Sequence, residues 1–86
     1  MKTVRLNKSF KKDFEKLRLY QKQAWAEAFG CFIENPWGRI LRRHKLSGQY
    51  HRLESIDVLP NLRGVFLETE NEFVFYHIGN HNQLYG

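Results

Sequence analysis

Four side chains in the 86-residue sequence are of types that handle protons or phosphate groups: His44, Arg63, His81 and Tyr85. Histidine can accept or donate a proton near neutral pH, and arginine can hold two phosphate oxygens at once. Cleavage of RNA by attack of a 2′-hydroxyl needs a base, an acid for the leaving 5′-oxygen and a cation for the phosphoryl oxygens. These residue types could supply that chemistry without a metal ion if the fold brings them together.

Each of these residues also has an ordinary structural explanation. A histidine in a polar loop is usually a surface residue, and Arg63 could simply pair with Glu54 or Asp57. Tyr85 could be a core aromatic residue with its hydroxyl in water. Residue type alone therefore leaves both explanations open.

Metal and cofactor chemistry have weaker support in the sequence. His77 and His81 are four residues apart, but His81 lies beyond the end of a predicted strand, so this spacing does not place both rings on one face as it would in a helix. No group of cysteines and histidines has zinc-like spacing, and no glycine-rich phosphate loop is present. Cys31 lies among Phe29, Phe32 and Ile33, which predicts a small buried apolar residue. We expect neither a metal ion nor a cofactor.

Charge is distributed unevenly along the chain. Residues 1–52 contain 13 lysines and arginines against four acidic residues, a net charge of +9, whereas residues 53–86 contain only Arg63 against five acidic residues, a net charge of −4. A basic half of this strength is typical of proteins that bind a polyanion or an acidic protein. Lysines and arginines on two solvated helix faces are the structural alternative.

The pattern of apolar residues predicts one domain over residues 1–86. Residues 3–6 are predicted to form a strand, and Phe10, Phe14 and Leu17 repeat at helical spacing. A second apolar helix extends to Asn35-Pro36, where the proline ends it. Strands are predicted over 50–59, 62–68 and from residue 73, joined by short turns. The prediction is a two-layer α+β domain of order βααβββ, with both helices on one face of a mainly antiparallel four-stranded sheet.

Composition and the N-terminal residues favour a cytoplasmic protein with no membrane association. The apolar runs are far shorter than the roughly 20 residues that a membrane span needs. The N-terminus lacks the apolar block of a signal peptide, and the single cysteine excludes an internal disulfide.

Three segments in the second half of the chain have recognisable patterns. HKLSGQY (44–50) has the pattern His-x-Leu-x-Gly-x-Tyr, LPNLRGVFLETENEF (59–73) has a proline-led strand and hairpin, and IGNHNQLYG (78–86) has the pattern Gly-x-His-x-x-Leu-aromatic-Gly. With the predicted order of elements, these segments resemble the RelE/ParE toxin superfamily of bacterial toxin–antitoxin systems. Within it they are most similar to the YafQ-type ribosome-dependent mRNA interferases.

The resemblance implies specific partners and roles. The protein would cleave mRNA on the ribosome and would be neutralised by a cognate antitoxin. Implied catalytic residues are His44, Asp57, Arg63, His81 and Tyr85. Implied RNA or phosphate contacts are Arg39, Arg42, Arg43, Lys45, Arg52 and Asn61, and candidates for base stacking are Trp37, Tyr50 and Tyr85.

Two positions differ from the YafQ-type pattern, because Asp57 replaces a histidine and Asn61 replaces an aspartate. Conversely, Arg63 resembles the phosphate-stabilising strand arginine of the RelE branch. Two other functions therefore stay open: a ParE-like gyrase inhibitor without nuclease activity, and a module that binds nucleic acid or a partner after loss of catalysis. If the interferase prediction is right, removal of residues 80–86 should leave a folded domain without toxicity.

Overall fold

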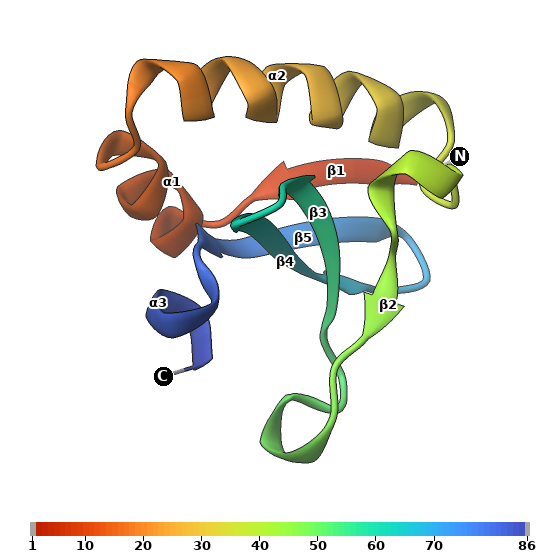
Figure 1. Cartoon of the computed structure of the whole chain (residues 1–86). Coiled ribbons are helices and arrows are strands. Elements are labelled where there is room, and N and C mark those ends of the chain that lie inside the picture. The colour runs from red at the N-terminus through yellow and green to blue at the C-terminus, as the bar shows by residue number, and fades with distance from the viewer. Residues whose placement is uncertain (1, 86) are drawn as a thin grey trace.

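The structure, a computed structural model that describes residues 2–85, combines helices and one sheet (Figure 1). The strands are β1 (Thr3–Leu6), β2 (His44–Lys45), β3 (Glu54–Leu59), β4 (Leu62–Glu68) and β5 (Glu72–Gly79). The α-helices are α1 (Lys8–Glu15), α2 (Leu19–Glu34) and α3 (His81–Tyr85), and two single 3₁₀ turns are η1 (Arg39–Leu41) and η2 (Gly48–Tyr50).

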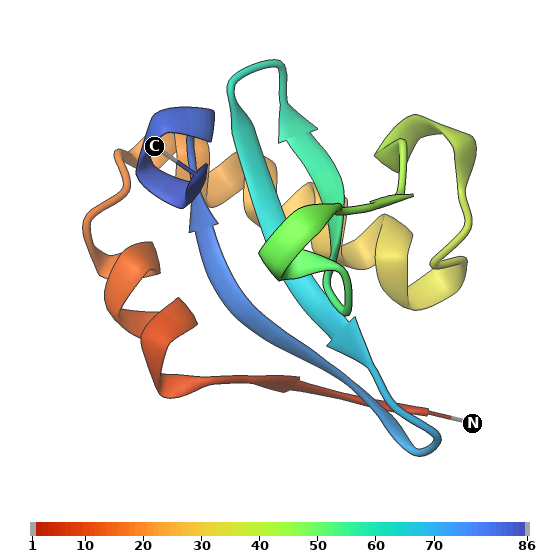
Figure 2. The same cartoon turned by 90° about the horizontal axis from the view of Figure 1, so that it is seen from below.

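The five strands form one sheet in the order β1-β5-β4-β3-β2. The last three long strands form an antiparallel meander, β2 adds to its edge in antiparallel orientation, and β1 pairs with β5 in parallel orientation. Figure 2 shows this meander with β1 on one side and the β2 segment on the other. The register places His44 opposite Ser55, and Asp57 opposite Arg63.

The core lies between the sheet and the pair α1 and α2. Phe32 of α2 and Phe75 of β5 are fully buried, and their ring centroids lie 5.1 Å apart. Phe10 of α1 and Trp25 of α2 pack against each other with centroids 4.9 Å apart. Such aromatic pairs add to the burial of apolar area, which is the main stabilising term in a chain of this size.

The opposite face of the sheet is covered only in part. In Figure 1, α2 lies above the sheet, whereas α3 and the segment between β2 and β3 lie below it. Because side chains alternate along a strand, Ile56 of β3 enters the core and its neighbours Ser55 and Asp57 point to this second face.

The predicted two-layer α+β fold is confirmed, and the structure adds two elements to it. The two-residue strand β2 makes the sheet five-stranded, and α3 follows the last strand. The strand predicted from Tyr50 begins only at Glu54, because Gly48, with φ of +66°, starts the turn η2. The prediction for Cys31 was wrong: the thiol lies on the outer side of α2 and is exposed. No helix within residues 2–85 is long and apolar enough to span a membrane.

Candidate active site

The candidate site forms on the second face of the sheet, where β2, β3 and β4 lie side by side. Directly opposed residues of neighbouring strands project to the same face, so the register brings four side chains together. They are His44, Ser55, Asp57 and Arg63. Ser55 is fully buried, and Asp57 and Arg63 retain 22% and 32% of their side-chain exposure.

His44 is held by hydrogen bonds at both ring nitrogens. Its Nδ1 lies 2.8 Å from the carbonyl oxygen of Arg42, and its Nε2 lies 3.0 Å from Oγ of Ser55. Arg42 has a φ of +50°, in the left-handed region that side chains rarely adopt, and this turn of the backbone brings its carbonyl next to the ring. The imidazole is therefore fixed from two sides by the protein itself.

Asp57 lies between two arginines. Its Oδ2 is 3.5 Å from Nε of Arg42, and its Oδ1 is 3.5 Å from Nε of Arg63. The Oδ1 atom is buried but makes no hydrogen bond, so these are ion pairs without full hydrogen-bond geometry. The carboxylate keeps two cations at this end of the sheet, and the exposed Arg42 side chain remains accessible to a polyanion.

The short helix α3 places His81 and Tyr85 beside this cluster. Its first turn is closed by a reciprocal pair of hydrogen bonds: the amide of Asn80 donates to Oε1 of Gln83, and the amide of Gln83 donates to Oδ1 of Asn80, both at 2.8 Å. This is a capping box, which satisfies amides that a helix start leaves unpaired. It sets the direction of the last residues of the chain.

Tyr85 joins α3 to the segment between β2 and β3. Its ring packs on His81, with centroids 4.9 Å apart, and on Tyr50 of η2, with centroids 5.7 Å apart. Its hydroxyl is buried and makes no hydrogen bond within the part of the chain that the structure describes. Burial raises the pKa of Tyr85. The neighbouring Ser55 and Arg63 lower the pKa, but by less than burial raises it. The phenol thus lies against the His44–Ser55 pair in its neutral form.

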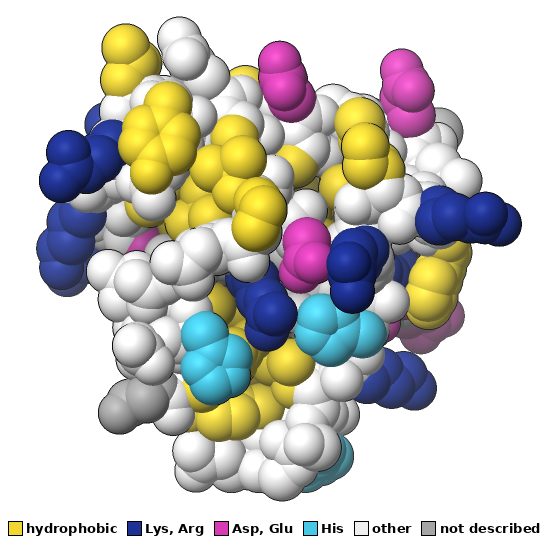
Figure 3. All heavy atoms as spheres, viewed as in Figure 1, with side chains coloured by type: hydrophobic (Ala, Val, Ile, Leu, Met, Phe, Trp, Pro, Cys, Tyr) yellow, Lys and Arg dark blue, Asp and Glu magenta, His cyan; other side chains and the backbone are white. Residues whose placement is uncertain are grey.

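Figure 3 shows the resulting surface. In the lower half of this view, histidine side chains lie on two sides of a patch of apolar side chains, and a lysine or arginine side chain lies directly above the patch. Proton-handling groups, cations and aromatic rings next to one another are the features that cleavage of single-stranded RNA requires.

Comparison with known proteins identifies the fold. No protein-family model matches the sequence, and no curated protein sequence matches it. Among solved structures, YafQ from E. coli strain BL21(DE3) matches with a TM-score of 0.80 at 19% identity, covering 100% of both chains. A copper-bound mutant toxin from Helicobacter pylori matches with a TM-score of 0.80 at 26% identity, covering 99% of this chain and 100% of that one.

A toxin–antitoxin complex from Mycobacterium tuberculosis, RelBE2, matches with a TM-score of 0.75 at 20% identity, covering 93% of this chain and 98% of that one. The chain has the RelE/ParE toxin fold. The match to YafQ extends over the full length of both chains.

Within this RelE/ParE fold, Arg43 does not lie where the sequence prediction placed it. Its side chain is only 2% exposed, its guanidinium pairs with Glu54 and Glu68, and it stacks at 3.8 Å on the ring of Trp37. Burial opposes the charge of Arg43, but the hydrogen bonds to Glu54 and Glu68 outweigh it, and the net pKa is raised. A contact between Arg43 and RNA is therefore incompatible with this structure, and Trp37 is occupied on one face.

The remaining predicted contacts lie outside the cluster. Lys45 and Arg52 line a separate hollow, beside Arg43 and its partners Glu54 and Glu68. Lys45 faces this hollow because it is the next residue along β2 and projects to the side opposite His44. Asn61 lies at the exposed turn between β3 and β4, beside Tyr20 of α2, and Arg39 is exposed at η1. They form a surrounding surface and are not part of the central site.

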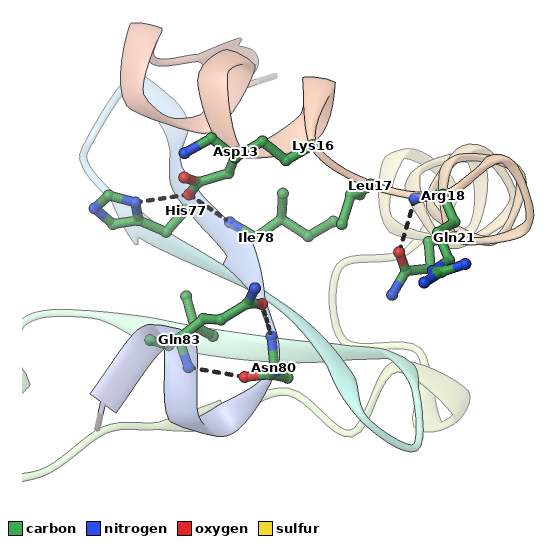
Figure 4. A pocket seen from close by; sticks show the side chains of 10 residues that line it. Asp13, Lys16, Leu17, Arg18, Gln21, His77, Ile78, Asn80 and Gln83 are labelled. Atoms are coloured by element: carbon green, nitrogen blue, oxygen red, sulfur yellow. Dashed lines mark hydrogen bonds and ion pairs between the residues drawn. The ribbon is translucent and has the colours of Figure 1, made fainter.

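A further hollow lies on the other side of α3 and contains the pair formed by His77 and Asp13 (Figure 4). Oδ2 of Asp13 lies 2.8 Å from Nδ1 of His77 and also accepts a hydrogen bond from the amide of Ile78 at 3.2 Å. These bonds connect α1 to the end of β5. His77 therefore has a structural role in this fold.

Ser55 and the cap of α3 were not among the predicted site features, whereas Tyr50 was predicted as a base-stacking residue. The alternation of Ser55 and Asp57 around Ile56 indicates that the serine shares a face with the aspartate. The spacing Asn80-x-x-Gln83 is a capping-box signal, although a five-residue helix is too short for apolar periodicity to reveal it. Within residues 2–85, no group of three or more histidine, cysteine or acidic side chains is arranged to hold a metal ion.

Proposed function

We propose that this protein is the toxin of a type II toxin–antitoxin system and cleaves mRNA on the ribosome by metal-independent acid–base catalysis. The observation that carries the proposal is the convergence of His44, Asp57, Arg63, His81 and Tyr85 at one end of a RelE/ParE-fold sheet. Asp57 and Arg63 remain partly exposed, so their pairing contributes little to the stability of the sheet and is not explained by packing alone.

Each group has a role that its position allows. Arg63 and Arg42 are the cations for the phosphate, held in place by Asp57. His81, exposed on α3, exchanges a proton directly with the RNA, and His44 completes the acid–base pair. Tyr85 and Tyr50 offer aromatic surfaces against which a base can stack. Lys45 and Arg52, in the separate hollow on the side opposite His44, are proposed as additional phosphate contacts outside the central site.

An antitoxin partner is part of the proposal. Solved relatives include a DinJ–YafQ complex and the RelBE2 complex, in which a toxin is bound to its antitoxin. In this protein the basic surface and the partly covered sheet face fit an acidic antitoxin segment. Exposed apolar side chains on and after α2, at Leu19, Tyr20, Ile33 and Ile40, offer the apolar part of such an interface.

The test is induced expression followed by mapping of mRNA 5′ ends. Wild-type protein should arrest growth and produce cuts in codon register. His81→Ala should reduce cleavage by about 10²- to 10⁴-fold, the usual contribution of an acid–base group. Arg63→Ala should reduce cleavage by about 10²- to 10³-fold, the usual contribution of a group that stabilises charge in the transition state. Matched controls are Asn82→Ala, exposed on the same helix, and Arg5→Ala on β1, which should cleave like wild type.

Two results would replace the proposal by another function. A DNA-damage response without mRNA cuts would indicate gyrase inhibition. The absence of any growth defect would indicate a binding module that has lost catalysis. Full activity of both His81→Ala and Arg63→Ala would contradict the catalytic assignment even if mRNA were cut.

A further inference from the structure

Ser55 is the most deeply buried polar residue of the site. It is fully inaccessible to solvent, lies in the middle of the sheet between β2 and β4, and its hydroxyl contacts the ring of His44 at 3.0 Å. A buried hydroxyl costs free energy unless it is hydrogen-bonded, and this bond is made to a group of the site and not to the backbone. The position therefore serves more than packing.

The chemistry of the two contacts fixes where the proton of His44 resides. The carbonyl of Arg42 can only accept, so Nδ1 of the ring must carry a hydrogen and donate it. In the neutral imidazole Nε2 is then unprotonated, and it accepts the hydrogen of the Ser55 hydroxyl. One hydrogen-bond pattern thus selects one tautomer and one ring orientation.

Resting on the function proposed above, we infer that Ser55 is a positioning residue that holds His44 with its proton on Nδ1 and keeps Nε2 unprotonated as a hydrogen-bond acceptor. Ser55 also links this ring to the other side of the site, because the buried hydroxyl of Tyr85 lies beside Ser55 and Arg63. Oγ of Ser55 retains lone pairs that can accept from either group.

The inference separates the roles of the two histidines. Both residues are exposed, but both ring nitrogens of His44 are hydrogen-bonded to other groups of the protein, whereas the ring of His81 packs on Tyr85. His81 is therefore the histidine assigned to direct proton exchange with the RNA. His44 is held by Ser55 in one tautomer and one orientation.

Nitrogen-15 NMR of the histidine rings tests this inference without any cleavage reaction. Wild-type protein, at a pH where the ring is neutral, should show a single His44 tautomer with hydrogen on Nδ1. Ser55→Ala should introduce a population with hydrogen on Nε2, and Ser55→Thr, which retains a hydroxyl on a strand, should restore the wild-type spectrum. Ser47→Ala, at an exposed serine that precedes η2, is the matched control and should change nothing.

Cleavage assays on the same proteins give the second readout. Ser55→Ala should slow cleavage by about tenfold to 100-fold, as expected when a reacting group is misplaced, and Ser55→Thr should recover it. A wild-type spectrum with hydrogen on Nε2, or a tautomer that Ser55→Ala leaves unchanged, would overturn the inference. If the wild-type protein cut no RNA, the proposed function would fail, while the spectra would still decide whether Ser55 sets the tautomer.

Discussion

The exposed residue His44 contacts the fully buried hydroxyl of Ser55, and the buried hydroxyl of Tyr85 lies beside Ser55. Their types are ordinary, but their surroundings give each group a defined state. Two hydrogen bonds fix His44, and burial keeps the Tyr85 phenol neutral. A site with these preorganised groups has less to reorganise when charge develops on a phosphate.

The raised pKa of Tyr85 gives a prediction about pH. An acid whose pKa is raised on folding stabilises the folded state below its unfolded value, near 10, and this contribution is lost as pH rises through the folded value. Phenolate absorbance is followed as pH is raised. The ionisation step at the highest pH in the folded protein should be absent from Tyr85→Phe. It should persist in Tyr20→Phe, because Tyr20 is 59% exposed. Persistence in Tyr85→Phe would contradict the burial argument.

The residue types of the site could be predicted from the sequence, but the burial of Arg43 and its pairing with two glutamates could not. His44, Arg63, His81 and Tyr85 are few and distinctive, so they stand out in a short chain. Arg43 looks identical to Arg42 in the sequence, and only pairing across β3 and β4 shows that its partners are Glu54 and Glu68. Long-range pairing buries Arg43, whereas Arg42, at the end of η1, stays exposed.

Among the elements, α3 depends most on a single local interaction. Gly79 immediately precedes the cap, and a Cβ atom built there would lie only 2.8 Å from Oε1 of Gln83. A side chain at this position would displace the glutamine that closes the first turn. The glycine and the capping box are therefore one unit, which places His81 and Tyr85.

This unit leads to a prediction for Gln83. Gln83→Ala should cost about 0.5–2 kcal/mol of stability, the usual cost of a lost cap, and should abolish most of the activity because α3 no longer holds Tyr85 in place. Gly79→Ala should behave similarly. Gln83→Glu retains the accepting oxygen and should keep α3 folded. Hydrogen exchange at the amides of Asn80 and Gln83, with thermal unfolding, measures the effect; equal protection in Gln83→Ala would contradict it.

The long strands and helices were predictable because their apolar residues repeat over several turns or pairs. The strand β2 has only two residues, and η2 interrupts a segment whose composition favours a strand. For these short elements, tertiary pairing and one positive φ value outweigh local propensity.

At the scale of the whole molecule, Arg43 connects distant parts of the chain. It pairs with Glu54 of β3 and Glu68 of β4, and Glu68 in turn pairs with Lys2 beside β1. The hydrogen bond from Lys2, with the bond from Arg43, outweighs the effect of burial and lowers the pKa of Glu68. This network closes the end of the sheet opposite α3 and holds the backbone that leads into His44.

Removing Arg43 should therefore destabilise the fold more than an exposed arginine would. Arg43→Ala leaves Glu54, only 8% exposed, without its partner, and loss of one member of a buried pair typically costs about 3–5 kcal/mol. Arg39→Ala, at an exposed site, should change stability by less than about 0.5 kcal/mol. Urea denaturation at pH 7 provides both values. Similar values for the two variants would show that the network carries little stability.

The central claim, that the clustered side chains on the second face of the sheet cut mRNA on the ribosome, is tested most directly with purified components. Purified protein is incubated with mRNA that is either free or bound in translating ribosomes, and the 5′ ends are mapped. We expect codon-registered cuts in ribosome-bound mRNA only, which are lost in the double variant His81→Ala/Arg63→Ala and retained in Asn82→Ala. Intact mRNA on the ribosome with wild-type protein, or equal cutting by the double variant, would contradict it.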